Sequence, residues 1–205
     1  RGFKNNKKPI RMIAVFDNFI QDQDLLLEIQ ENKADIFKDP GNFKWFAGWW
    51  DNPTAKLNTT QKIIKYAWGE NCPITDIYGL DGFEYWTGIQ KAKLPTGEKD
   101  GWDDFLEPHF DKDEAWHKKT GEIVTPVIGS IYYPEGSAFE GGELHIFTDG
   151  ADKPPEIVKA KPNRFIIFQA GQHVHTVKTV TKGTRYAIAI NLWENAPYSK
   201  QTGKL

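Results

Sequence analysis

The segment His175-Thr-Val-Lys-Thr-Val-Thr-Lys-Gly-Thr-Arg185-Tyr-Ala-Ile-Ala-Ile-Asn-Leu-Trp193 decides the fold of this chain. Its Gly183 predicts a tight turn that joins two antiparallel strands. In the second strand alternate residues share a face, so Arg185 lies with two alanines and Asn191, opposite a bulky aliphatic face. We expect the arginine to face inward, where the alanines leave room for a small anion. The alternative is an outward arginine in a surface ion pair, which would turn both alanines toward water.

Further strands and helices are predicted around this hairpin. Short β-prone runs, separated by clusters of Gly, Pro, Asn and Asp, occur at 83–87, 124–133, 143–148, 164–169, 175–180 and 185–193. Upstream, the pattern predicts a strand over 11–19, an amphipathic helix over 21–36 and a second helix that begins at Asn58 or Thr59. Helices followed by many short strands favour a mostly β fold, an antiparallel sandwich or jelly roll buttressed by N-terminal helices.

The composition limits the class of protein. With 205 residues, of which 39% are hydrophobic and eight are Trp, the chain can form one sizeable domain with a real core. The net charge of −2 makes nucleic acid an unfavoured partner, because nucleic-acid-binding proteins normally carry a basic patch. A single cysteine, Cys72, fits the reducing cytoplasm. No apolar run has the length of a transmembrane helix and no signal-peptide pattern is visible, so we expect no membrane association.

Two histidines, one aspartate and the arginine form a candidate metal and anion site. In His109-Phe-Asp111 the first and third side chains project from one face of an extended chain, so both can bind one ion. His175 adds a second imidazole. Two imidazoles and one carboxylate leave three positions of an octahedral ion open, which suits a bidentate 2-oxo acid and dioxygen at non-haem Fe(II). The planar guanidinium of Arg185 matches a carboxylate with two parallel hydrogen bonds, as an anchor for 2-oxoglutarate requires.

Other histidines compete for the metal. His173 lies two residues from His175 on the same face and is the alternative ligand, although the spacing to the turn and to the arginine favours His175. We expect His145 to be solvated or to line the pocket. We expect His117 to lie in a polar surface loop.

Two other features allow more than one interpretation. The segment 88–107 is long, charged and contains Gly and Pro, so it is predicted to be a lid or a plain surface insertion. Trp45, Trp49 and Trp50 are expected in the core or in the wall of a groove, where exposed ones would offer a platform for a peptide.

Several motifs together carry a family resemblance. They are Tyr85-x-x-Gly88, His109-x-Asp111, Ser130-Ile-Tyr-Tyr-Pro134, Gly141-Gly-Glu-Leu-His-Ile-Phe147, Asn163-Arg-Phe-Ile-Ile-Phe168 and His175-x-Val followed by Arg185-Tyr-Ala-Ile. In order and spacing, the chain from about Phe83 to Trp193 resembles the prolyl-hydroxylase branch of the 2-oxoglutarate/Fe(II) oxygenases. It is particularly similar to the catalytic domains of the hypoxia-inducible-factor prolyl hydroxylases. No single motif is specific, but the combination is.

The resemblance implies a fold and a domain organisation. The fold would be a double-stranded β-helix, a cupin-like jelly roll, with the metal near one mouth of the barrel. We expect residues 1–205 to form a single oxygenase domain, in which 10–80 supply helical and strand support and about 83–193 form the β-helix core.

The resemblance also assigns the site. It implies an Fe(II) site with three protein ligands, which are the catalytic residues His109, Asp111 and His175. Arg185 and Tyr133 would bind the distal carboxylate of 2-oxoglutarate, and Tyr85 would hydrogen-bond near its metal-chelating end. Dioxygen would be the second co-substrate and ascorbate an accompanying reductant.

The substrate is the least determined part. The resemblance implies a prolyl residue in a protein or peptide; a free amino acid or another small molecule is the alternative, and nucleic-acid demethylation comes third. A non-catalytic jelly-roll binding module is the alternative from another class. The chain departs from its relatives in two places. The loop between Tyr85 and His109 is longer, and Asn191 stands where the relatives carry a Trp, with Trp193 two residues further on.

Overall fold

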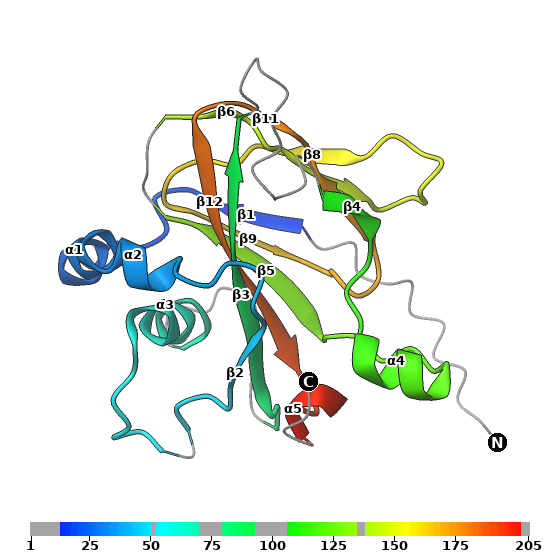
Figure 1. The fold of residues 1–205 in the computed structure, drawn as a ribbon, viewed down its shortest axis with the longest axis horizontal. Helices are drawn as coiled ribbons and strands as arrows, with labels where there is room; N and C mark the ends of the chain where they lie inside the picture. The colour runs from blue at the N-terminus through cyan, green and yellow to red at the C-terminus, as the bar shows by residue number, and fades with distance from the viewer. Residues whose placement is uncertain (1–12, 51, 70–78, 93–105, 135–137, 202–205) are drawn as a thin grey trace.

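The computed structural model describes residues 13–50, 52–69, 79–92, 106–134 and 138–201, which are coloured in Figure 1. The strands are β1 (Ile13–Phe16), β2 (Lys44–Phe46), β3 (Gly82–Lys91), β4 (Leu106–His109), β5 (Ile128–Tyr133), β6 (Glu140–Gly141), β7 (Leu144–Phe147), β8 (Glu156–Val158), β9 (Arg164–Phe168), β10 (Val174–Val177), β11 (Val180–Lys182) and β12 (Thr184–Trp193). The helices are α1 (Gln23–Glu31), α2 (Lys33–Ile36), α3 (Thr59–Trp68), α4 (Glu114–Thr120) and α5 (Tyr198–Gln201).

Two antiparallel sheets form the body of the structure. The major sheet has the strand order β1-β9-β5-β12-β3-β2, and the minor sheet has the order β4-β10-β7-β8. A separate two-stranded ribbon consists of β11 and β6. The long strands β12 and β3 pair over their whole length, from Thr184 opposite Lys91 to Trp193 opposite Gly82. The prediction of a mostly β jelly roll with N-terminal helices is confirmed.

The alternating pattern of β12 builds a hydrophobic layer on each face of the major sheet. On one face Ile188, Ile190 and Leu192 are fully buried against α1, α2 and α3, which lie together on that side of the sheet in Figure 1. On the other face a second cluster lies between the two sheets, with Ile131 of β5 and Ile146 of β7 among its members. The face that carries Arg185 therefore points into the space between the sheets.

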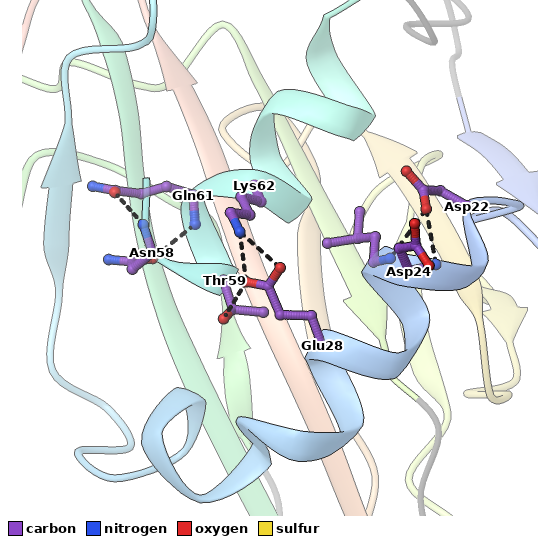
Figure 2. Close-up of polar contacts among 8 residues, drawn as sticks. Asp22, Asp24, Glu28, Asn58, Thr59, Gln61 and Lys62 are labelled. Atoms are coloured by element: carbon purple, nitrogen blue, oxygen red, sulfur yellow. Dashed lines mark hydrogen bonds and ion pairs between the residues drawn. The ribbon is translucent and has the colours of Figure 1, made fainter. Parts of the chain in front are cut away.

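The N-terminal helices are fixed by polar contacts at their starts (Figure 2). The Asp22 carboxylate caps α1 by accepting hydrogen bonds from two backbone N–H groups, at 3.0 and 3.1 Å. Asn58 and Gln61 cap α3 reciprocally, at 2.9 and 3.1 Å. Glu28 of α1 accepts hydrogen bonds from Thr59 and Lys62 of α3 and so ties the two helices together.

A buried asparagine joins the helical layer to the sheet. Asn163 adopts a positive φ of 52°, and its side chain accepts a hydrogen bond from the Ile20 N–H and donates one to the Ile20 carbonyl, both at 3.0 Å. This pair of bonds holds the segment before α1 against the start of β9. A change to an apolar residue would leave buried backbone groups without partners.

The structure corrects several predicted boundaries. The helix over 21–36 is interrupted at Asn32, whose ψ of 14° ends α1 before α2 begins. The strand predicted over 83–87 runs on to Lys91, because β12 pairs with it throughout. The segment 88–107, expected to be a lid or a surface insertion, therefore has wrong bounds, since 88–91 belong to β3 and Leu106 begins β4. Residues 93–105 lie outside the described residues, as does Cys72.

Short elements account for the other differences. The run predicted at 175–180 is divided between β10 and β11. The pattern gave no signal for the short strands β2, β6 and β8 or for helix α4. Within the described residues the longest helix, α3, has only ten residues, so none of these helices is long and apolar enough to cross a membrane.

Candidate metal centre and active site

The central strand β12 places four side chains on one wall of a pocket between the sheets, those of Arg185, Ala187, Ala189 and Asn191. Arg185 lies opposite Gln90 of β3, Ala187 opposite Gly88, and Ala189 opposite Trp86. The two alanines and the glycine lack bulk, so the wall is hollow beside the arginine. Arg185 is only 4% exposed, which confirms that it faces inward.

The pocket has a volume of about 450 Å³ and is partly open to solvent. It is lined from both sheets by Trp86, Gly88, Gln90, Glu107, His109, Asp111, Ile131, Leu144, Phe168, His175, Arg185, Ala187, Ala189 and Asn191. By surface area most of this lining is apolar, and its polar groups gather at two places, around Asp111 and around Arg185. Such a cavity has the size and character of a small-molecule site.

The first polar place is a cluster of two imidazoles and one carboxylate. Each of His109, Asp111 and His175 offers one ligand atom, and these atoms lie within 4.8 Å of one another. Asp111 Oδ1 is 3.4 Å from His109 Nε2 and 3.7 Å from His175 Nε2. His109 of β4 and His175 of β10 are direct register partners of each other. The pairing of the two strands therefore brings together residues that are distant in sequence. Two nitrogen donors and one carboxylate oxygen match the donor set of a non-haem Fe(II) site.

Backbone groups orient the three side chains. The Nδ1 atom of His109 lies 2.7 Å from the Glu107 carbonyl oxygen, and Nδ1 of His175 lies 3.0 Å from that of His173. An imidazole that donates through Nδ1 presents an unprotonated Nε2 to a metal. Asp111 follows the end of β4, and its backbone N–H donates to the Ala170 carbonyl at 2.9 Å.

The protonation of Asp111 and of His175 also suits metal binding. Burial opposes ionisation of Asp111, but hydrogen bonds from His109 and Asn191 and the electrostatic interaction with His175 hold its pKa below the ordinary value. Burial lowers the pKa of His175. In His109 burial acts in the same direction, but contacts with the Asp111 carboxylate and the Glu107 carbonyl outweigh it and raise the pKa. An ionised Asp111 beside a neutral His175 is ready to bind a cation, whereas any proton on His109 Nε2 must leave before that atom can bind.

The second polar place surrounds the guanidinium of Arg185. Its Nη1 donates to Gln90 Oε1 at 2.8 Å and its Nη2 to the Tyr133 hydroxyl at 3.2 Å. Its buried Nε has no hydrogen-bond partner among the described residues. Gly142, with φ of 69°, lies so close that an added Cβ would be 2.7 Å from Arg185 Cδ. The arrangement can bind a carboxylate through a guanidinium and a phenol at one end of an apolar pocket.

The prediction for Tyr85 is wrong. Its register partner on β12 is Ile190, so its side chain lies on the opposite face of β3 from Trp86. It is 4% exposed, in the hydrophobic cluster that packs against the helices. The parity of β3 therefore removes it from the pocket.

The remaining predicted residues lie at different distances from the site. His173 is buried next to the cluster and supplies a backbone carbonyl to it, whereas His145 faces away from the pocket on β7. His117 lies on α4, with Nδ1 3.2 Å from the Glu122 carbonyl oxygen. Trp49 and Trp50 pack against Phe83 in the helix-side core, as one of the two interpretations of these tryptophans predicts.

Two contacts were not assigned from the sequence. Asn191 donates from Nδ2 to Asp111 Oδ2 at 2.9 Å, and Gln90 accepts from Arg185. The parity that turns Arg185 inward also turns Asn191 inward, so this signal was available. Gln90 could not be found in the same way, because its position depends on the extension of β3.

Comparison with known proteins agrees with this geometry. Residues 99–193 match the family model described as the 2OG-Fe(II) oxygenase superfamily. The matched segment contains the cluster His109, Asp111 and His175, which could bind the Fe(II) that this family implies together with 2-oxoglutarate and dioxygen. No curated protein sequence matches the chain.

Solved structures of prolyl hydroxylases and a related oxidoreductase share the fold. A Pseudomonas putida prolyl-4-hydroxylase has a TM-score of 0.57 and 14% identity, with 91% of this chain and 95% of that chain covered. An oxidoreductase of the 2OG-Fe(II) oxygenase family from Burkholderia pseudomallei has a TM-score of 0.55 and 13% identity, with 89% and 84% covered. A viral collagen prolyl hydroxylase from Paramecium bursaria Chlorella virus-1 has a TM-score of 0.51 and 15% identity, with 95% and 98% covered. The fold is thus a double-stranded β-helix.

Proposed function

We propose that this 2-oxoglutarate-dependent dioxygenase hydroxylates a C–H bond of prolyl residues in a protein or peptide. His109, Asp111 and His175 would hold Fe(II), and Arg185 with Tyr133 would bind the distal carboxylate of 2-oxoglutarate. The observation that carries the proposal is the convergence of three ligand atoms within 4.8 Å, in the same pocket as a buried guanidinium.

The donor set fits the metal. Fe(II) in oxygenases of this kind takes two imidazoles and one carboxylate on one face, which leaves the other positions for the co-substrates. When bound, it would couple the oxidative decarboxylation of 2-oxoglutarate, to succinate and carbon dioxide, to insertion of an oxygen atom into a substrate C–H bond. The protein fixes both histidines through backbone carbonyls, so Nε2 of each faces the site without reorganisation.

The second part of the pocket would position the co-substrate. Arg185 can bind a carboxylate with two parallel hydrogen bonds, while Gln90 and Tyr133 restrict the orientation of its guanidinium. Burial strengthens this ion pair, because little water competes for the charges. The apolar lining between the two polar places, including Ile131 and Leu144, would keep water away from the reacting carbon.

Support for a prolyl substrate comes from the fold and from the pocket rim. Two of the compared structures are prolyl hydroxylases, at 14% and 15% identity. At the rim, Trp86 lines the pocket and packs against Phe43, which is 45% exposed, with ring centroids 4.6 Å apart. An aromatic surface of this kind would suit the flat, apolar ring of proline. We also propose that residues 1–205 form one domain, since α1, α3 and the major sheet share one hydrophobic cluster.

The test is a hydroxylation assay with peptides. The purified protein would be incubated in air with Fe(II), 2-oxoglutarate, ascorbate and a library of proline-containing peptides. We expect succinate and a peptide that has gained the mass of one oxygen atom on proline, neither of which His175→Ala should form. A parallel assay without ascorbate would test whether ascorbate serves as the reductant. Turnover with free amino acids or other small molecules, and not with any peptide, would overturn the prolyl assignment.

A further inference from the structure

We propose that Asn191 is a positioning residue that orients the Asp111 carboxylate, and this inference rests on the metal site proposed above. Asn191 lies on the central strand β12 and is 3% exposed. Its Nδ2 donates to Asp111 Oδ2 at 2.9 Å. The other carboxylate oxygen, Oδ1, faces Nε2 of both histidines, at 3.4 and 3.7 Å. One oxygen is therefore held by the protein, and the other is directed at the metal position.

The neighbouring strand leaves room for the amide. Asn191 is the register partner of Gly129 on β5, and a Cβ at Gly129 would lie 3.0 Å from Asn191 Oδ1 and 2.4 Å from the Ala170 side chain. The absence of a side chain at Gly129 thus makes room for the amide. Ala170 also accepts the backbone N–H of Asp111 at 2.9 Å. The Asp111 backbone is thus held beside Ala170, and the Asn191 amide occupies the space that Gly129 leaves next to it.

The hydrogen bond matters because the carboxylate is nearly buried. The Asp111 side chain is 13% exposed, and an ionised carboxylate at such a place needs donors to offset its loss of water. Without Nδ2 the group would be free to rotate about its Cβ–Cγ bond and would turn either oxygen, or both, to the metal. An amide does not titrate in the physiological range, so it keeps this donor at every working pH. Loss of a group that orients a metal ligand typically weakens metal binding by about 10- to 100-fold.

The test measures Co(II) binding, in the absence of 2-oxoglutarate and of turnover. Co(II) serves as a spectroscopic stand-in for Fe(II), and its visible absorption reports both affinity and coordination. Asn191→Leu removes the donor and keeps the volume of the side chain. We expect the dissociation constant for Co(II) to rise about 10- to 100-fold and the Co(II) absorption to change shape. The melting temperature of the metal-free protein is recorded for each variant.

The matched control is Tyr132→Phe, which removes another buried hydrogen bond from the same sheet. Tyr132 is fully buried on the helix-side face, and its hydroxyl donates to Asn163 Oδ1 at 3.3 Å, so it does not touch the metal cluster. Its Co(II) affinity should stay within about twofold of the wild type. If both variants weaken Co(II) equally, or if Asn191→Leu binds Co(II) like the wild type, the positioning role is overturned.

Two further measurements keep the outcomes distinct. The wild type should bind Co(II) and His175→Ala should not; failure here would contradict the proposed metal site itself and not the role of Asn191 alone. If Asn191→Leu does not fold, Asn191→Ala replaces it, because a smaller side chain beside Gly129 cannot overpack the sheet. A folded Asn191→Ala protein with wild-type Co(II) affinity would equally overturn the inference.

Discussion

The guanidinium of Arg185 donates from Nη2 to the hydroxyl of Tyr133, 3.2 Å away, and its carbon lies 4.9 Å from the centre of the tyrosine ring. The two residues come from β12 and β5, which are adjacent in the major sheet. Because both are almost completely buried, the cation has little solvent to stabilise it. A carboxylate that enters the pocket would meet a positive charge already oriented by a phenol on one side and by Gln90 on the other.

Arg185→Ala should therefore weaken 2-oxoglutarate binding by about 100-fold or more, because a buried charge-assisted pair is lost. Fe(II) binding should be nearly unchanged, since within the described residues the guanidinium bonds to Gln90 and Tyr133 and to none of the three cluster residues. The measurement is an anaerobic titration of the Fe(II) protein with 2-oxoglutarate, followed through the weak visible charge-transfer band of the complex. Arg185→Lys keeps the charge but not the planar fork of the guanidinium. Its affinity for 2-oxoglutarate should lie between that of the wild type and that of Arg185→Ala. Wild-type affinity in Arg185→Ala would exclude this residue as the anchor.

Gly142→Ala should weaken 2-oxoglutarate binding without a change at the metal. The new Cβ would lie 2.7 Å from Arg185 Cδ, and the φ of 69° adds about 1–2 kcal/mol of backbone strain. We expect about a tenfold higher dissociation constant in the same titration. Gly121→Ala is the matched control, because Gly121 has a φ of 78° but nothing within 4 Å of an added Cβ. Gly121→Ala should lower the melting temperature and leave the affinity for 2-oxoglutarate unchanged. An equal effect of both variants on this affinity would contradict the contact between Gly142 and Arg185.

His175→Ala should abolish the anaerobic charge-transfer band that Fe(II) and 2-oxoglutarate give together. The side chain supplies one of three ligand atoms, and its loss leaves two. His145→Ala provides the control, since His145 lies on the neighbouring strand β7 with its side chain on the opposite face of the minor sheet. This variant should keep the band at full intensity. A band that survives in His175→Ala would mean that the metal binds elsewhere.

The strand pattern predicted the inward face of β12 well, because a period of two is written directly into its residues. The predicted hairpin around Gly183 is wrong, since β11 pairs with β6 and β12 pairs with β3 and β5. The pattern could not predict how far β3 extends, since Gly88 and Gln90 are weak strand formers that become ordered by pairing with Ala187 and Arg185. The break of the first helix at Asn32 was missed for the opposite reason. Its hydrophobic stripe continues through the interruption, so the pattern alone shows one helix.

The site was predictable where the chain carries an unusual combination of residue types. His109, Asp111 and His175 have recognisable spacing to Arg185, and the structure brings the three side chains together. Tyr85 was assigned by resemblance alone, and the register of β3 removes it from the pocket. Contacts between strands distant in sequence depend on register, which residue types do not encode directly.

A buried carboxyl beside the site leads to a prediction about pH. Glu84 of β3 lies opposite Asn191 and is 9% exposed. Burial raises its pKa to about 7, Lys200 opposes the shift, and the charges of Asp111 and Asp113 add to it. In the unfolded chain the pKa returns to the ordinary glutamate value of 4.5.

The sign of the effect follows from which state binds the proton. Between pH 4.5 and about 7 the folded protein holds a proton on Glu84 that the unfolded chain has released, so the free energy of unfolding falls as pH rises through this window. Above it, the ionised group costs about 3 kcal/mol at most. The side chain of Glu84→Gln cannot ionise, so the free energy of unfolding of this variant does not fall for this reason. Its melting temperature should equal that of the wild type near pH 5 and exceed it by several degrees at pH 8.

Thermal unfolding of the metal-free protein at the two pH values measures this difference. Glu114→Gln is the control, because that carboxylate is 75% exposed on α4 and its removal should change the melting temperature little at either pH. Subtracting wild type from variant at each pH cancels the other titrating groups, including the histidines of the cluster, as long as Glu84→Gln leaves them in place. A stabilisation that is equal at pH 5 and pH 8 would mean that Gln packs better than Glu for reasons other than charge. A larger stabilisation at pH 5 would show that the carboxyl is ionised in the folded protein well below pH 7, against the environment described here.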